Sequence, residues 1–139
     1  MSESSEQWTE GVHHVGLTVP DLEAALRFFT EGLGMKQVGE VLSYPAAFVS
    51  DGHVMVTLWR AKDPENATPF DRQQGIGLHH LSLQVAEATR LDALHERLAA
   101  WEDVEIEFAP EPLGGGPTRH MMCAIPGGIR VEFIAPASS

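Results

Sequence analysis

Hydrophobic and polar residues alternate in two short stretches of the chain that closely match each other. Residues 12–19 read Val-His-His-Val-Gly-Leu-Thr-Val, and residues 78–85 read Leu-His-His-Leu-Ser-Leu-Gln-Val. Alternation with a period of two residues is typical of a half-buried β-strand. The two stretches share their histidine doublets and lie 66 residues apart, from His14 to His80. The repeat therefore predicts two copies of one structural unit.

Each copy has the pattern of a strand, a helix and then three further strands. Asp21 is expected to cap the first helix and Thr89 the second. In the first copy, the elements are expected at 12–19, 22–31, 36–42, 46–49 and 54–60. In the second copy, strands are expected at 78–85, 104–108, 119–124 and 129–134, with the helix between the first two.

The length of 139 residues is that of about one average domain. We divide the chain into an acidic N-terminal tail, residues 1–10, and a single domain, residues 11–139. Within that domain, module one covers about 11–62 and module two about 76–136. The polar, turn-rich segment 63–75 is the linker between the modules.

The charge balance excludes some classes of partner. The chain has 9 Lys plus Arg against 20 Asp plus Glu, for a formal net charge of −11. Nucleic acid and anionic membranes are therefore not expected as partners, because their phosphates would be repelled. The first residues lack the basic and apolar segments of a signal peptide, and no apolar run is long enough to span a bilayer. A cytoplasmic protein is the expectation.

Two of the seven histidines share a face of the expected sheet with one glutamate. Successive side chains of a strand point to opposite faces, which places His14 and His80 on the polar face and His13 and His79 toward the helices. Glu132 lies on the polar face of the last strand, between two apolar neighbours. Singly, each could be an ordinary strand residue. Together, repeated in two modules, they are typical of a 2-His-1-carboxylate metal site.

The type of ion follows from this ligand set. Three protein ligands leave open positions on an octahedral ion such as Fe(II) or Mn(II), where water, oxygen or a bidentate substrate binds. Zn(II) and Ni(II) are alternatives. The single cysteine, Cys123, excludes a thiolate-rich site. Its position in the alternation predicts a buried, inert thiol.

These motifs resemble those of a known family. Residues 13–22, with Gly-Leu-Gly-Met at 32–35, resemble the opening of the vicinal oxygen chelate superfamily of glyoxalases, bleomycin resistance proteins and extradiol dioxygenases. Residues 78–85 and 126–134 resemble the two ends of its second module. The resemblance implies an α+β fold of two tandem βαβββ modules, with a mixed sheet curled into a cup and the helices outside. It also implies metal ligands at His14, His80 and Glu132, and a homodimer.

Departures from the family pattern bear on the reaction. Glyoxalase I and related epimerases have a fourth ligand where this chain has Thr57, which weighs against isomerase chemistry. Extradiol dioxygenases have the three-ligand set, but they carry an acid/base tyrosine where this chain has Met122. His120 lies two residues earlier, on the same strand face near Glu132. It is either the missing proton carrier or a histidine at the rim of the cup.

We therefore expect a divalent-metal-dependent, dioxygenase-like enzyme with His120 as its catalytic proton carrier. Its substrate would be a small molecule that chelates the metal through vicinal oxygens. Thr57, Gln84, Arg119 and Met122 are expected to line the substrate pocket. Two alternatives remain, a non-catalytic drug-binding or resistance protein and a glyoxalase-type lyase or isomerase.

Overall fold

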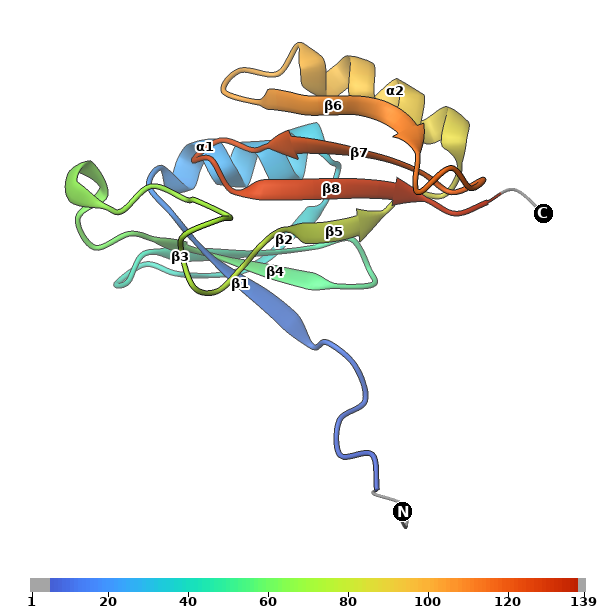
Figure 1. Cartoon of the computed structure of the whole chain (residues 1–139). Helices are drawn as coiled ribbons and strands as arrows, with labels where there is room; N and C mark the ends of the chain where they lie inside the picture. Colours follow the sequence, from blue (N-terminus) through green and yellow to red (C-terminus); the bar gives the residue numbers. More distant parts are fainter. Residues whose placement is uncertain (1–5, 138–139) are drawn as a thin grey trace.

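The computed structural model describes residues 6–137. The first five residues of the predicted tail, and the last two of the predicted domain, lie outside the described residues. Module one consists of β1 (His14–Val19), α1 (Leu22–Arg27), the π-helical turn η1 (Phe28–Gly32), β2 (Lys36–Val41), β3 (Ala46–Ser50) and β4 (Met55–Arg60). Module two consists of β5 (Leu81–Gln84), α2 (Ala88–Ala99), β6 (Glu105–Pro112), β7 (Arg119–Ala124) and β8 (Arg130–Ala135). The linker contains a short 3-10 turn, η2 (Pro64–Asn66). The predicted α+β fold of two βαβββ modules is confirmed (Figure 1).

The two modules have the same strand order. Each forms a four-stranded mixed sheet, β1-β4-β3-β2 in module one and β5-β8-β7-β6 in module two, and neither closes into a barrel. The first and last strands of each module are parallel, and the other pairs are antiparallel. Gly16 pairs with Thr57 in the first sheet, and Ser82 pairs with Glu132 in the second. Thr57 and Glu132 are therefore equivalent positions on the central strands β4 and β8.

The two helices begin in different ways, and only α1 has a side-chain capping hydrogen bond among the described residues. The Asp21 carboxylate accepts a hydrogen bond from the backbone N–H of Ala24 at 3.0 Å, so the predicted cap of α1 is confirmed. The prediction that Thr89 caps α2 is wrong, because the cap residue is Glu87, two residues earlier. The Thr89 hydroxyl instead donates to the Glu87 carboxylate at 3.2 Å.

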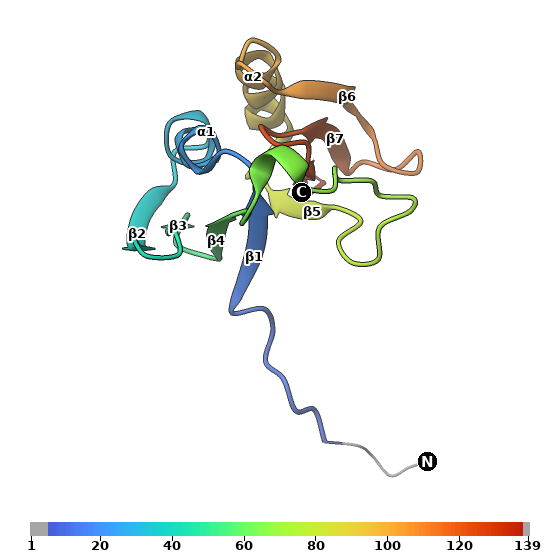
Figure 2. The same ribbon diagram turned by 90° about the vertical axis from the view of Figure 1, so that its left-hand side faces the viewer.

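One hydrophobic core joins the two modules. Each helix packs on one face of its own sheet, and buried side chains of both modules form a single cluster. Figure 2 shows α1 and α2 on the same side of the molecule. The ring of Phe28 in η1 meets the ring of Trp101, just after α2, edge to face at 6.5 Å. Arg97 of α2 also donates to the backbone carbonyls of Glu31 and Gly32, at 2.6 and 3.0 Å.

The histidine doublets lie at the start of the parallel strands rather than inside them. Strand β1 begins at His14, and β5 begins at Leu81, one residue after the second doublet. His13 and His79 are exposed, so the expectation that they face the helices is wrong. Strand alternation does not extend to residues that precede the ladder. No helix within residues 6–137 is both long enough and apolar enough to cross a membrane.

Candidate active site

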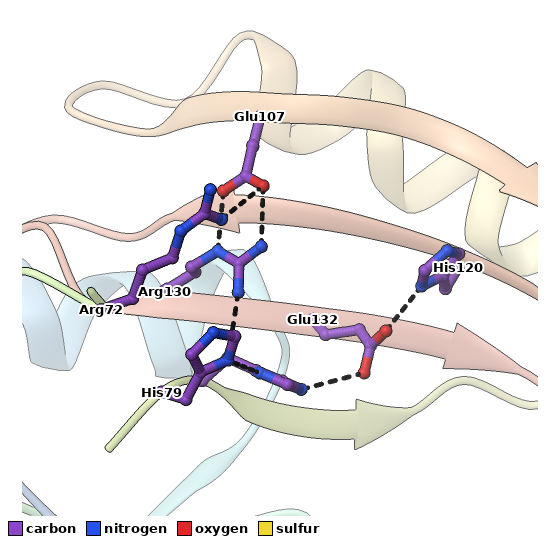
Figure 3. A network of polar contacts seen from close by, with 7 residues as sticks. Arg72, His79, Glu107, His120, Arg130 and Glu132 are labelled. Carbon is purple, nitrogen blue, oxygen red and sulfur yellow. Dashed lines mark hydrogen bonds and ion pairs between the residues drawn. The ribbon is translucent and has the colours of Figure 1, made fainter. Parts of the chain in front are cut away.

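Glu132 is the centre of the polar cluster in module two. It lies on β8 between Val131 and Phe133, and its exposed fraction is only 9%. Its Oε2 atom is 2.6 Å from Nδ1 of His120 on β7, and its Oε1 atom is 3.5 Å from Nε2 of His80 (Figure 3). Each oxygen of one carboxylate therefore faces a different histidine.

The carboxylate of Glu132 is held in its ionised form. Burial raises the pKa of Glu132, but the hydrogen bonds from His120 and Ser82 lower it, as do the charges of His120 and His80. The lowering effects prevail, and the pKa lies below its ordinary value. An ionised carboxylate only accepts hydrogen bonds. His120 therefore donates through Nδ1–H, and in the neutral ring its Nε2 atom carries a free lone pair.

The other residues that were expected near the site have different surroundings. The ring of His120 packs on Phe108 of β6, with ring centroids 4.8 Å apart. Met122 is buried on β7, directly opposite Glu132 in the register. Gln84 is exposed at the end of β5. The guanidinium of Arg119 donates to the carbonyl of Pro110 at 3.0 Å, so it ties β7 to β6.

The third predicted metal ligand, His14, lies in the other module. It is exposed on β1, and its Nδ1 atom is 2.9 Å from Nδ1 of His13. Within residues 6–137, no three His, Cys, Asp or Glu side chains are grouped closely enough to hold a metal ion. The single chain thus brings His80 and His120 to Glu132, and it leaves His14 apart from them.

Thr57, a predicted pocket residue, is enclosed within module one. Its side chain is 4% exposed. Its hydroxyl accepts a hydrogen bond from the indole N–H of Trp59 at 2.8 Å and lies 3.5 Å from the carbonyl of Val15, to which it donates. Tyr44 and Phe48 pack around the same indole ring. This position therefore offers no carboxylate to an ion.

A second polar network next to the doublet of module two was missed by the sequence reasoning. The Nε and Nη2 atoms of Arg130 bind the two oxygens of Glu107 on β6, both at 2.8 Å, and Arg72 of the linker adds a contact at 2.9 Å (Figure 3). The hydrogen bond from Arg130, with further contributions from Arg72, outweighs burial and lowers the pKa of Glu107 to about 2. The Nη1 atom of Arg130 is 3.4 Å from Nδ1 of His79. The one available signal was that Arg130 shares a strand face with Glu132, two residues away.

Cys123 is not part of the site. Its side chain is fully buried on β7, and burial raises the pKa of its thiol to about 12. The thiolate, which is the reactive form, is thus unavailable at neutral pH. The prediction of a buried, inert thiol is confirmed.

Comparisons with known proteins agree with this fold. The sequence profile of the Glyoxalase/Bleomycin resistance protein/Dioxygenase superfamily matches residues 11–133. The chain is 30% identical to a 2-epi-5-epi-valiolone epimerase of Actinomyces sp, over 88% of this chain and 78% of the relative. It is also 30% identical to the protein YqjT of Bacillus subtilis, over 91% of this chain and 99% of the relative. The solved glyoxylase/bleomycin resistance protein/dioxygenase domain from Frankia sp. EAN1pec superposes with a TM-score of 0.80 at 27% identity, covering 95% of this chain and 96% of that domain.

Proposed function

The chain belongs to the Glyoxalase/Bleomycin resistance protein/Dioxygenase superfamily, and from this premise we propose a divalent-metal-dependent enzyme that moves protons on a small, oxygen-rich substrate. The observation that carries the proposal is the carboxylate of Glu132, with one oxygen beside His80 and the other beside His120. The first contact suits an ion, and the second suits a proton carrier. The epimerase among the relatives supports the same class of reaction.

His80 and Glu132 fit a divalent ion in their donor chemistry and in their spacing. Two ligands that are each about 2.0–2.2 Å from one ion lie roughly 3–3.5 Å apart. The Nε2 atom of His80 and the Oε1 atom of Glu132 are 3.5 Å apart. Imidazole and carboxylate suit Fe(II) and Mn(II), with Zn(II) and Ni(II) as alternatives. A bound ion would supply Lewis-acid stabilisation of negative charge on a substrate oxygen.

We propose that His14 of a second copy of this chain completes the ligand set in a homodimer. His14 is exposed in the single chain, so it is available to another copy. Large apolar side chains are also exposed near the start of both modules, as is common at protein interfaces. They are Trp8 at 85%, Val12 at 71% and Ile76 at 104%.

His120 is placed to act as a general base. The hydrogen bond from its Nδ1–H to Glu132 orients the ring and leaves Nε2 to take a proton from a substrate carbon next to a carbonyl group. The electron pair of the broken C–H bond moves onto the carbonyl oxygen as an enolate. A water molecule on the opposite face of that carbon then supplies a second proton, which re-forms the C–H bond and gives the epimer. His120 releases the first proton to the hydroxide that this leaves, so the protons balance.

A dioxygenase-like reaction is the second candidate, and one observation favours it. The Thr57 hydroxyl is bonded to Trp59 inside module one, so this module contributes no carboxylate as a fourth ligand. Three protein ligands leave more open positions on the ion for oxygen and substrate.

The test measures proton exchange and oxygen consumption on the same preparation. The protein, loaded in turn with Mn(II), Fe(II), Zn(II) or Ni(II), is incubated with 2-epi-5-epi-valiolone in D2O and followed by proton NMR. We expect metal-dependent deuterium incorporation next to the carbonyl. With the metal ion at a saturating concentration, the His120→Gln substitution should lower its rate by about 10²–10⁴-fold. His53→Gln, at an exposed turn position, is the matched control.

Each alternative has its own outcome in this experiment. Oxygen consumption with catechols and no deuterium exchange would establish the dioxygenase-like reaction instead. Tight binding of a small molecule without metal or turnover would identify a binding protein. Equal exchange rates in the His120→Gln variant and the wild type would remove His120 from the mechanism.

A further inference from the structure

A continuous line of polar contacts leads from β6 to the site in module two. Arg130 is bound to Glu107, and its Nη1 atom lies 3.4 Å from Nδ1 of His79. That Nδ1 atom is 2.8 Å from Nδ1 of His80. The Nε2 atom of His80 in turn faces Glu132. Figure 3 shows this line running between the two carboxylates.

The direction of each hydrogen bond in this line follows from the first donor. A guanidinium group has five N–H donors and no acceptor. The Nδ1 atom of His79 must therefore accept the hydrogen bond from Arg130, so its ring proton is on Nε2. Two Nδ1 atoms at 2.8 Å need one donor between them. Because His79 is the acceptor, His80 donates through Nδ1–H, and in the neutral ring of His80 the Nε2 atom then carries the free lone pair.

Arg130 is firmly held in the orientation that this argument requires. Its side chain is only 12% exposed, and two of its nitrogens form a fork with the carboxylate of Glu107. Bidentate pairs of this kind restrict the guanidinium plane more than a single contact does. The remaining nitrogen, Nη1, is thereby directed at His79.

Module one contains the same doublet without the arginine. His13 and His14 approach each other through their Nδ1 atoms at 2.9 Å. The residue beside His14 on the neighbouring strand is Met55, where module two has Arg130. A methionine side chain donates no hydrogen bond. Both modules therefore contain the histidine doublet, but only module two has a guanidinium group, that of Arg130, beside it.

We propose that Arg130 is a positioning residue that, through His79, fixes His80 as the Nδ1–H tautomer and presents its Nε2 lone pair to the metal ion. The inference rests on the proposed metal-dependent function. Removal of a residue that orients a metal-binding histidine commonly weakens metal affinity by about 10–100-fold.

The experiment reads the tautomers directly in the metal-free, full-length protein. With 15N-labelled histidine at pH 8, long-range proton–nitrogen NMR shows which ring nitrogen carries the proton. We expect Nδ1–H for His80 and Nε2–H for His79 in the wild type. In Arg130→Met, which installs the module-one residue, His80 should show both tautomers. Its Co(II) affinity, measured by calorimetry, should fall about 10-fold.

Two further variants separate positioning from folding. Arg72→Met removes a different partner of Glu107 and has no contact with His79, so the tautomer and the affinity should stay as in the wild type. Arg130→Lys retains a donor without the fork and should restore part of the His80 Nδ1–H signal. It also keeps the test valid if Arg130→Met does not fold.

The outcomes are distinct. An Nε2–H signal for His80 in the wild type would overturn the inference. Unchanged tautomers and an unchanged Co(II) affinity in folded Arg130→Met would also overturn it. If Arg130→Met does not fold, a folded Arg130→Lys whose His80 shows no more Nδ1–H signal than Nε2–H signal would overturn it instead. The expected tautomers in a wild-type protein that binds no Co(II) would support the positioning role and overturn the proposed metal-dependent function.

Discussion

Thr57 and Glu132 occupy the same register position in the two modules, and they are the two buried polar side chains found within residues 6–137. Their neighbours differ. Thr57 is bonded to the indole of Trp59, whereas Glu132 faces two imidazoles. In β3 and β7, which pair with these strands, Ala46 stands where module two has His120.

The comparison shows how one backbone serves two purposes. In module one, the large side chain next to the central position is aromatic and comes from the same strand, β4. In module two, the large polar side chain comes from the neighbouring strand, β7, and the equivalent of Trp59 is Ile134. Module one thus surrounds this position with aromatic packing, whereas module two surrounds its carboxylate with two imidazoles.

The largest effect is expected from substitutions that test whether His14 of module one is a ligand at the site of His80 and Glu132 in module two. Glu132→Gln and His14→Gln should each reduce metal-dependent activity at least about 100-fold when alone, because each removes a ligand. If each site combines His80 and Glu132 of one copy with His14 of the other, a heterodimer of the two variants has one intact site and one site that lacks both substituted ligands. Its activity, measured on differently tagged and purified heterodimer, should return to about half of the wild-type value.

The two homodimeric variants, mixed after purification without subunit exchange, are the control and should stay inactive. Failure of the isolated heterodimer to recover activity would show that the site lies within one chain, and it would contradict the homodimer proposal.

The second effect is the loss of stability expected when a glutamate is placed at position 57 of module one, which is equivalent to Glu132 of module two. Thr57→Glu would bury a charge that has no histidine beside it, so the free energy of unfolding should fall by about 3–5 kcal/mol. Burial raises the pKa of such a carboxyl group in the folded state, so the loss should be greatest above that pKa and should shrink as the pH falls. Urea denaturation at pH 8 and pH 5 measures both. Thr57→Gln is the uncharged control of the same size, and an equal loss in both variants would assign the effect to volume rather than charge.

The smallest effects are expected at Gly16 and Ser82, the residues that pair with Thr57 and Glu132 on the neighbouring strands. A Cβ atom at Gly16 would lie 3.1 Å from Oγ1 of Thr57 and 3.5 Å from Nε1 of Trp59. Gly16→Ala should therefore lower the free energy of unfolding by about 1–2 kcal/mol. Ser82→Ala, at the equivalent exposed position, removes only a hydrogen bond to Glu132 and should cost less than about 1 kcal/mol. A larger loss for Ser82→Ala in urea denaturation would contradict the view that module one is the tightly packed face.

Most of the fold could be predicted from the sequence because the repeat and the strand alternation carry it. The strand Arg119–Ala124 has the predicted bounds, and most other strands differ from theirs by one or two residues. The exceptions are β5, which begins three residues later than predicted, and β6, which ends four residues later. Alternation also predicted that His120 and Glu132 share a face, and the two side chains are in contact. This works because both residues lie well inside a regular antiparallel pair, β7 and β8.

The rest depends on contacts that no local pattern specifies. Glu107 on β6 meets Arg130 on β8 across the single intervening strand, β7. The pairing of β6 with β7 shifts register twice. Each shift moves side chains relative to the neighbouring strand, so sequence spacing alone does not place Glu107. His79 lies before its strand begins, where the period of two residues no longer applies.

The contact of Arg97 with the carbonyls of Glu31 and Gly32 links the folding of the two modules. The last carbonyls of a helix have no partner inside it, and here those of η1 receive theirs from the helix of the other half. A single copy, separated at the linker, would lose these donors together with the ring of Trp101 against Phe28. Each half therefore completes the other as a folding unit.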